Sequence, residues 1–319
     1  MRCAVAAAIA LGVAATGGSA SSLPASARLV YAALVSPARS DGVFDVDKAA
    51  DLFSIRVDGT DSRRLTRTVQ WETDPAWSPD GRRLVFSRGR THCHGGTCAG
   101  ALDGSLWVAS AGGGAPRRLT HGYLDRWPTW APDGQRIAFV RQDCCDDAPY
   151  EGVYVVGADG RGLRRVLATR AAGVDWSPDG AAIAVLGQPP EGGEMVLRLL
   201  DVTTGAASDV DANGLGSPLA VAWSPDGRTL AVVTGNGISL VARAGGTARR
   251  LVSAFYVTGV SWAPDGRRLA FNGSRERRRP RPELARLDPT DLWVIGRDGS
   301  GLRRLTRTPG PELAPDWRR

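Results

Sequence analysis

The sequence predicts an all-β fold, namely a six-bladed β-propeller, and three observations carry this prediction. A short phrase, Trp-(Ser/Ala)-Pro-Asp-Gly, returns five times along the 319 residues. Successive copies lie 39 to 53 residues apart, which is the length of a four-stranded propeller blade. Between the copies, short runs rich in β-branched and aromatic residues, such as SLWVAS and GVYVVG, alternate with glycine and proline. These runs predict strands and exclude a helical repeat of similar length.

The first strand of each blade ends in the tryptophan of this phrase, whose ring is large enough to fill the space between neighbouring blades. Proline and glycine then set the backbone of a tight turn, and the aspartate bonds to its own downstream backbone. A sixth tryptophan stands in the closing ELAPDWRR. The six structural tryptophans are Trp77, Trp130, Trp176, Trp223, Trp262 and Trp317.

The other three strands of each blade are also visible. A second strand such as RRLVF follows the turn, a third ends at a glycine turn, and a fourth reads Arg-Arg-Leu-Thr or a close variant. The chain near residue 28 opens with a second-type strand, ARLVYAAL, whereas it ends on a first-type strand. We therefore expect the C-terminal Trp strand to pair with the N-terminal strands in one blade, which closes the ring.

Residues 1–27 predict a secretory signal peptide, because Arg2 precedes a glycine-broken apolar run and small residues follow up to Ala27. The run is shorter than the roughly 20 apolar residues of a membrane-spanning helix. We expect residues 28–319 to form one propeller domain, without a transmembrane segment. Its expected location is secreted or extracytoplasmic, in the periplasm or the cell-wall space.

The phrase WSPDGRRLVF and its four relatives resemble the repeat of the TolB-like propeller family, a WD40-like repeat also termed PD40. The resemblance covers residues 28–319 and leaves no stretch for the separate N-terminal domain that TolB carries. It implies the propeller fold and a role in binding. Related propellers also cover the active sites of prolyl oligopeptidase-type peptidases.

Binding is expected on the face of the disc that carries the long loops. The phrase turns and the glycine turns are short everywhere at one face, whereas the insertions fall on the other, and long loops on a rigid scaffold concentrate function. The channel mouth on that face should be lined near the starts of the first strands. Its expected contacts are Asp74, Arg126, Trp127, Tyr256 and Glu312. The alternative is that these residues only cap strands.

Four cysteines follow the predicted signal peptide, Cys93 and Cys98 in one long loop and Cys144 and Cys145 in the next. Export favours disulfides, and the sequence does not choose among the three pairings. The alternative is a metal site. Its ligands would be His92, Cys93, His94 and Cys98, with Asp146.

The sequence favours a binding protein over an enzyme. The related peptidases carry a Gly-x-Ser-x-Gly nucleophile, which this sequence lacks. We expect no catalytic residue, cofactor or metal ligand that can be placed, although an oxygen-lined channel mouth suits Ca²⁺. The prediction is an exported binding or scaffold propeller for a protein, a peptide or a cell-envelope component. The runner-up is an accessory chain of a peptidase, or an enzyme acting on carbohydrate or peptide with Asp74 and Glu312 as its carboxylate pair.

The formal net charge of +7 does not indicate nucleic-acid binding. Five Arg-Arg pairs stand at the same place, the outermost strand of a blade, where they form a solvated rim that discourages sheet pairing between molecules. One basic run is more concentrated, at residues 275–286 with Arg277, Arg278 and Arg279. This run either holds an acidic polymer or lipid surface or is simply an insertion.

Overall fold

The computed structural model describes residues 27–35, 50–94, 97–112, 114–121, 124–142, 150–235, 237–275, 290–308 and 310–318, without the side chains of residues 90–103. These ranges contain 26 β-strands and no helix. The predicted all-β class is confirmed. Within the same ranges the chain has no helix of the length and apolar character that would cross a bilayer.

Six four-stranded antiparallel units, here called blades 1 to 6, account for 24 of the strands. Blade 1 contains β26 (Glu312–Trp317), β1 (Arg28–Leu34), β2 (Ala50–Arg56) and β3 (Arg63–Arg64). Blade 2 contains β4 (Trp71–Trp77), β5 (Arg83–His94), β6 (Thr97–Ser110) and β7 (Arg117–Arg118). Blade 3 contains β8 (Leu124–Trp130), β9 (Arg136–Gln142), β10 (Gly152–Gly157) and β11 (Arg164–Leu167).

Blade 4 contains β12 (Ala171–Trp176), β13 (Ala182–Gly187), β14 (Val196–Asp201) and β15 (Ala207–Asp209). Blade 5 contains β17 (Pro218–Trp223), β18 (Thr229–Thr234), β19 (Gly237–Ala242) and β21 (Arg249–Ser253). Blade 6 contains β22 (Tyr256–Trp262), β23 (Arg268–Ser274), β24 (Asp291–Gly296) and β25 (Arg303–Arg304). The remaining strands, β16 (Ala212–Asn213) and β20 (Gly246–Thr247), form a small parallel pair.

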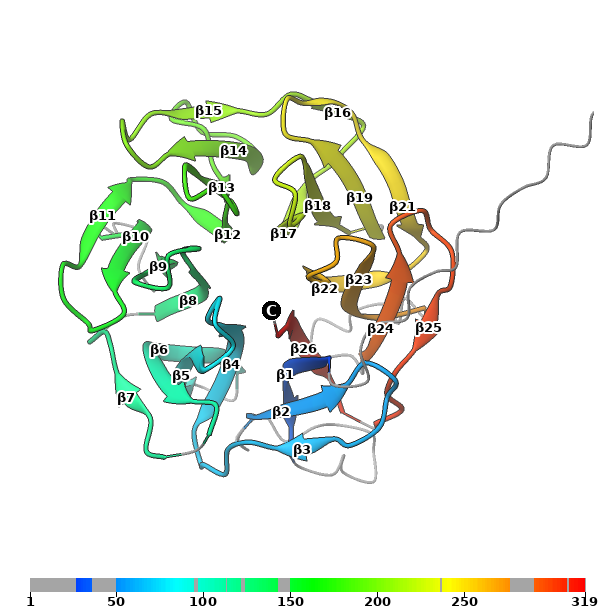
Figure 1. The fold of residues 1–319 in the computed structure, drawn as a ribbon. Helices are drawn as coiled ribbons and strands as arrows, with labels where there is room; N and C mark the ends of the chain where they lie inside the picture. Colours follow the sequence, from blue (N-terminus) through cyan, green and yellow to red (C-terminus); the bar gives the residue numbers. More distant parts are fainter. Residues whose placement is uncertain are drawn as a thin grey trace, which may run out of the picture.

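The blades stand around a central axis, with the Trp-bearing strands innermost and the short Arg-bearing strands at the rim (Figure 1). Blades 2 and 3 join into one eight-stranded sheet, because β6 pairs with β8 at Gly104 and Leu124. Among the described strands no hydrogen-bonded sheet runs round the whole ring. The blades are therefore held together mainly by the packing of side chains and by side-chain hydrogen bonds and ion pairs between neighbouring blades.

The two chain ends meet in blade 1. Strand β26 pairs with β1 in antiparallel register, from Leu29 opposite Trp317 to Ala33 opposite Glu312. Figure 1 shows β26 in dark red beside β1 in blue, with β4 and β22 on either side. The C-terminal Trp strand thus lies where the sequence placed it, against the N-terminal strands.

The hydrophobic core lies between the blades. Trp176 of blade 4, whose side chain is fully buried, belongs to one hydrophobic cluster with Val140, Val153 and Val155 of blade 3. Strands buried on both faces read as continuous apolar runs. The six buried residues of β13, AIAVLG, are such a run.

The phrase turns close the end of the disc called here the turn face, and the opposite end is the loop face. Gly81 has a φ of 63°, which an L side chain rarely adopts, and the equivalent glycines behave alike. The carboxylate of Asp80 accepts hydrogen bonds from Ser78 Oγ at 2.5 Å and from the Arg82 N–H at 3.0 Å. The predicted bond from this aspartate to its downstream backbone is therefore present.

Candidate binding face

The channel mouth lies where the innermost strands begin, on the loop face. Three successive inner strands, β26, β4 and β8, carry a β-bulge in which a residue other than glycine has positive φ. These residues are Ala314 (46°), Asp74 (52°) and Trp127 (49°), and a proline follows each. A bulge re-aims a side chain, and non-glycine residues at positive φ concentrate at functional sites.

The mouth is asymmetric, because the other three inner strands lack this feature. At the same position, three residues before the tryptophan, they carry Gly173, Ala220 and Gly259, none of which has positive φ. The half of the mouth formed by blades 4, 5 and 6 is thus edged by small residues, while the half formed by blades 1, 2 and 3 carries Asp74 and Trp127.

Asp74, Arg126 and Trp127, all predicted from the sequence, lie together in this half. Arg126 Nε donates to Asp74 Oδ2 at 2.7 Å, so the ion pair connects blades 2 and 3. The guanidinium also stands 5.1 Å from the ring centre of Trp127. The Arg126 side chain is 25% exposed and that of Asp74 8%, which leaves Arg126 and the half-buried Trp127 as the accessible groups.

Glu312 is instead buried between blades 1 and 6. Its Oε2 accepts from the Leu292 N–H at 2.9 Å and from the Thr306 hydroxyl, and its Oε1 accepts from Thr308 Oγ1 at 3.0 Å. Burial raises the pKa of Glu312 to about 7, against the lowering effect of the two threonine bonds, and the nearby Asp291 raises it further. Glu312 therefore joins blades in this conformation and does not face the channel.

Glu312 stands five residues before the tryptophan of its strand. Two other inner strands carry a carboxylate at that position, and the sequence analysis did not predict either of them. Asp125 forms a bidentate ion pair with Arg141, in which Nε and Nη2 donate to the two carboxylate oxygens at 2.7 and 3.0 Å. Both side chains are buried. Glu72 accepts from Arg88 Nε at 2.8 Å, and burial raises its pKa. Glu312, Glu72 and Asp125 thus fix the starts of three neighbouring inner strands. Their shared spacing to tryptophan was the available signal in the sequence.

The rim arginines tie blades together instead of serving only as solvated charge. In three of the pairs, those that begin with Arg117, Arg249 and Arg303, the first arginine reaches the glycine turn of the next blade. Arg117 donates to the carbonyls of Ala158 and Asp159 at 2.7 and 3.0 Å. Arg303 in the same way reaches the carbonyls of Val57 and Asp58. Much of the basic charge is consequently used inside the molecule.

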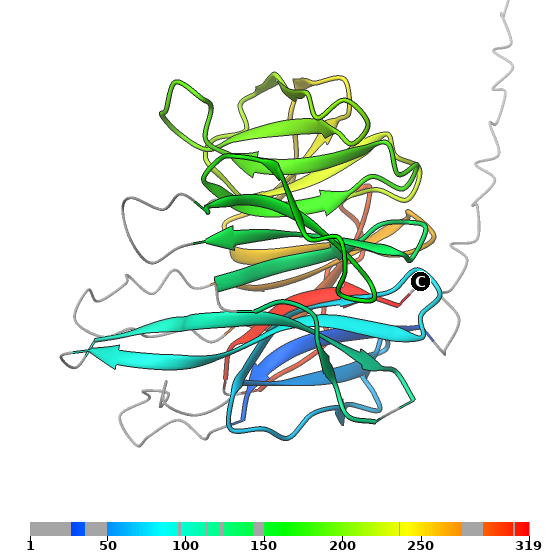
Figure 2. The same cartoon turned by 90° about the vertical axis from the view of Figure 1, so that its left-hand side faces the viewer.

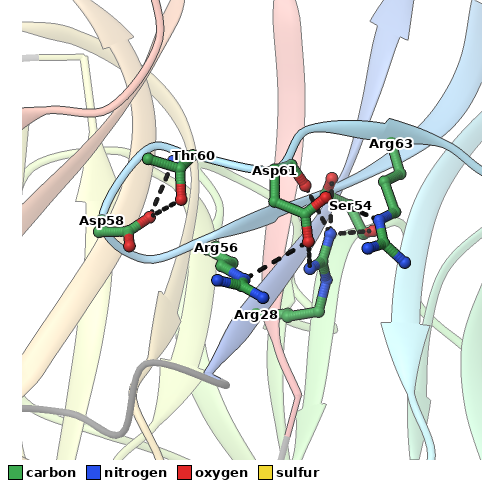
Figure 3. A network of polar contacts seen from close by, with 7 residues as sticks. All are labelled: Arg28, Ser54, Arg56, Asp58, Thr60, Asp61 and Arg63. Carbon is green, nitrogen blue, oxygen red and sulfur yellow. Dashed lines mark hydrogen bonds and ion pairs between the residues drawn. The ribbon is translucent and has the colours of Figure 1, made fainter.

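The turn face is strongly charged but largely self-paired. At the end of blade 1, Arg28, Arg56 and Arg63 surround the carboxylate of Asp61 (Figure 3). Hydrogen bonds from Arg63 and Arg28 lower the pKa of Asp61 to about 2. Between blades 5 and 6 a cleft of about 1010 Å³ has Arg297 and Asp226 in its wall, 3.1 Å apart.

Most of the exposed large apolar side chains among the described residues lie at the loop face. Six large apolar side chains are exposed within the described residues, and four of them lie at or just before the start of an inner strand or of β10, at the loop face. These four are Val69 (94%), Tyr150 (51%), Leu219 (43%) and Tyr256 (37%). The other two, Leu65 and Leu163, lie at the rim strands. Tyr256, which the sequence analysis assigned to the binding face, is thus accessible at the start of β22.

The remaining predicted residues lie outside the described part of the chain. This holds for Arg277, Arg278, Arg279, Cys144 and Cys145, for Asp146, and for residues 1–26 of the predicted signal peptide. Cys93 and Cys98 are described through their backbone alone. Within the described residues no cluster of three or more metal-ligating side chains occurs.

No protein-family model matches the chain. Among curated proteins it is similar to an uncharacterised peptidase, YuxL of Bacillus subtilis, at 30% identity over 117 residues, which are 35% of this chain and 17% of that one. It is also similar to an uncharacterised protein of Agrobacterium fabrum at 27% identity over 148 residues, 43% of this chain and 47% of that one. The match spans less than half the length of either relative.

Solved structures define the class of fold more firmly. TolB of Acinetobacter baumannii aligns with 92% of this chain and 67% of its own, at a TM-score of 0.70 and 17% identity. A TolB candidate from Agrobacterium tumefaciens aligns with 88% of this chain and 89% of its own, at a TM-score of 0.61 and 18% identity. An oligogalacturonate lyase is also similar, at a TM-score of 0.51. A gluconolactonase of Xanthomonas campestris is similar at a TM-score of 0.56.

Taken with the blades and the inner Trp strands, these likenesses define a β-propeller whose loop face carries the accessible apolar groups. More narrowly, its fold is that of a TolB-like propeller, as the sequence predicted. Because lyases and lactonases share the architecture, the fold leaves the choice between binding and catalysis to the residues of the mouth.

Proposed function

We propose that this protein is an exported binding or scaffold propeller that holds a protein or peptide of the cell envelope on its loop face. The observation that carries the proposal is the placement of Val69, Tyr150, Leu219 and Tyr256 at that face. Exposed apolar and aromatic groups rimmed by polar ones favour protein contact, and tyrosine, tryptophan and arginine dominate the binding energy of interfaces.

The charged and aromatic side chains at the channel mouth support this proposal. Arg126 is held by Asp74 at 2.7 Å and stands over Trp127, so a charged and an aromatic group are fixed before any partner arrives. Preorganised side chains reduce the ordering cost of binding. Tyr256 and Leu219, from blades 6 and 5, offer apolar contacts at the starts of neighbouring inner strands.

The proposed location is extracytoplasmic. Its support is the signal-peptide pattern of residues 1–27 together with the TolB-like fold. Fractionation of cells that produce the whole chain would test this part by itself. A mature protein that starts near residue 28 outside the cytoplasm supports export, and an uncleaved cytoplasmic chain overturns it.

The binding test uses residues 28–319 immobilised on a support and an extract of the producing cell's own envelope, with retained proteins identified by mass spectrometry. Leu219→Ser and Tyr256→Ser should each reduce retention of a stoichiometric partner at least tenfold. Leu163→Ser is a matched control, because Leu163 is 44% exposed and Leu219 43%, yet Leu163 belongs to the rim. Equal retention by all three variants would overturn the assignment of the loop face.

A second candidate is an enzyme, or an accessory chain of a peptidase, working at the mouth. It is supported by the likeness to an oligogalacturonate lyase and a gluconolactonase, and by the partial match to a peptidase. Against the predicted carboxylate pair, Glu312 is fully buried and Asp74 is bound to Arg126. Envelope glycans or peptides that are retained and then released shortened would favour this candidate. Asp74→Asn would then be the first variant to assay.

A further inference from the structure

Strands β5 and β6 form a hairpin that extends past the rest of blade 2. The pairing of β5 with β4 ends at Gly89, and the pairing of β6 with β8 is confined to Gly104. Beyond those two glycines the hairpin continues to His94 and Thr97 and pairs with no other described strand. In the side view this cyan hairpin projects beyond the coloured ribbons of its neighbours (Figure 2). We call this projecting part the arm.

The register of the arm places two cysteines opposite each other. Cys93 pairs with Cys98, one step below the terminal pair of His94 and Thr97. The two residues between the terminal pair are glycines, the sequence that a two-residue hairpin loop favours.

In such a hairpin the terminal pair exchanges both backbone hydrogen bonds, so the next pair is of the non-bonded kind. The Cα atoms of a non-bonded pair stand about 4.5 Å apart, which lies inside the range of about 4.4 to 6.8 Å that a disulfide spans.

The same register separates the cysteines from the histidines. Successive residues of a strand alternate between its two faces. His92 and His94 therefore share one face of the arm, while Cys93 and Cys98 share the other. The register therefore places the histidines and the cysteines on opposite faces, which argues against the metal site that the sequence left open.

We propose that Cys93 and Cys98 are joined by a disulfide that clasps the tip of the arm. The two thiols lose two protons and two electrons as the S–S bond forms, and a small-molecule disulfide such as oxidised glutathione takes them up and leaves as two thiols. An oxidising compartment outside the cytoplasm supplies such an oxidant. A two-stranded ribbon by itself is marginally stable in water, so a bond at its tip keeps the arm paired.

Trypsin offers a direct test, because its cleavage sites put each cysteine pair in its own peptide. Cleavage after Arg90 and Arg117 releases residues 91–117 with Cys93 and Cys98, and cleavage after Arg141 and Arg161 releases residues 142–161 with Cys144 and Cys145. The whole chain, exported by its host, is alkylated without reduction, digested and measured by mass spectrometry. The expected result is the 91–117 peptide without alkylation and lighter than its reduced form by two hydrogens.

Two outcomes would overturn the proposal. One is a 91–117 peptide alkylated at both cysteines, which means free thiols. The other is a cross-linked species that joins residues 91–117 to residues 142–161. A double variant, Cys144→Ser with Cys145→Ser, provides a second readout, because it removes every competing partner in the mature chain and should leave the intrapeptide bond unchanged. Loss of the bond in that variant also contradicts the proposal.

Discussion

The carboxylate of Asp316 accepts a hydrogen bond from the backbone N–H of Trp77 at 2.8 Å, across 239 residues of sequence. Asp316 is the residue before the last tryptophan, and Trp77 ends the inner strand of the next blade. The other oxygen of Asp316 accepts from Ser261 Oγ of blade 6 at 3.0 Å. One side chain thus connects blades 6, 1 and 2 where the two ends of the chain meet.

The same arrangement occurs on the opposite side of the ring. Asp175 accepts from Trp223 N at 2.7 Å and from Thr129 Oγ1 at 2.8 Å, which connects blades 3, 4 and 5. From blade to blade, the residue before the tryptophan is therefore first a threonine or serine, then an aspartate and then an alanine. This order occurs twice around the ring. In the alanine blades the indole N–H of the next tryptophan donates to the alanine carbonyl instead, from Trp130 to Ala76 and from Trp262 to Ala222. This inner belt repeats after three blades.

Removing either aspartate of the belt should weaken the contacts between blades. In Asp316→Ala the N–H of Trp77 loses its acceptor, and an unsatisfied buried donor costs about 1 to 3 kcal/mol. We expect that loss in the free energy of unfolding measured in urea, a similar loss for Asp175→Ala, and additive losses in the double variant, because the two groups share no partner. Asp316→Asn, which keeps an acceptor, is the control. A loss for Asp316→Ala no larger than that for Asp316→Asn would contradict the role of the hydrogen bond.

Some features of this inner belt could be predicted from the sequence and others could not. Trp77 and its relatives, the phrase turns and the meeting of the chain ends were predictable, because each depends on residues close together in sequence or on the count of strands. The partners of Asp316 and Asp175 lie on neighbouring blades, so no local pattern reveals them. Glu312 was predicted at the mouth because a glutamate at a strand start looks the same whether a neighbouring blade covers it or water does.

The stability of the protein should depend on the protonation of Glu312. Its pKa is raised to about 7 in the folded state from 4.5, so the folded protein holds the proton more tightly than the unfolded chain. Stability should therefore fall as pH rises from about 4.5 to about 7, by an amount on the order of 3 kcal/mol. Charged groups near Glu312 include Asp291, which also raises the pKa, while Tyr31 is neutral in this window.

Glu312→Gln tests that dependence, because glutamine does not titrate. We expect the variant to match the wild type in urea unfolding at pH 5 and to exceed it at pH 8. The difference between the two proteins isolates Glu312, since the contributions of other titrating groups such as Glu72 cancel. A difference that does not change with pH would show that Glu312 is ionised throughout.

Asp61 should act in the opposite sense at acid pH. Bonds from Arg63 and Arg28 hold its folded pKa at about 2, below the ordinary 3.8, so its contribution to stability is present above about pH 4 and disappears as pH falls through 2. Asp61→Asn should remove that part of the acid unfolding profile and leave the profile above pH 5 parallel to the wild type. Titration of the carboxyl by NMR provides the direct measurement, and a midpoint near 4 would contradict the prediction.

The first arginines of the rim pairs should stabilise the ring. Arg303 of blade 6 donates to two backbone carbonyls of blade 1, and Arg303→Ala should cost about 1 kcal/mol of unfolding free energy. The matched control is Arg307→Ala, an exposed arginine four residues later, for which we expect a change within about 0.5 kcal/mol. Equal effects of the two substitutions would mean that the rim charge acts only through its overall field.

Strain at the mouth predicts a substitution that stabilises the protein. Ala314 has a φ of 46°, a conformation that costs a residue with a Cβ about 1 to 2 kcal/mol, and glycine adopts it without that cost. Glycine also has more conformational freedom in the unfolded chain, which offsets part of this gain, so Ala314→Gly should raise the free energy of unfolding by about 0.5 to 1 kcal/mol. Ala220 holds the equivalent place in blade 5 without positive φ, so Ala220→Gly should instead lower it by about 0.5 to 1 kcal/mol. Urea unfolding of both variants gives the comparison, and a loss of stability in both would show that the bulge at Ala314 is relaxed.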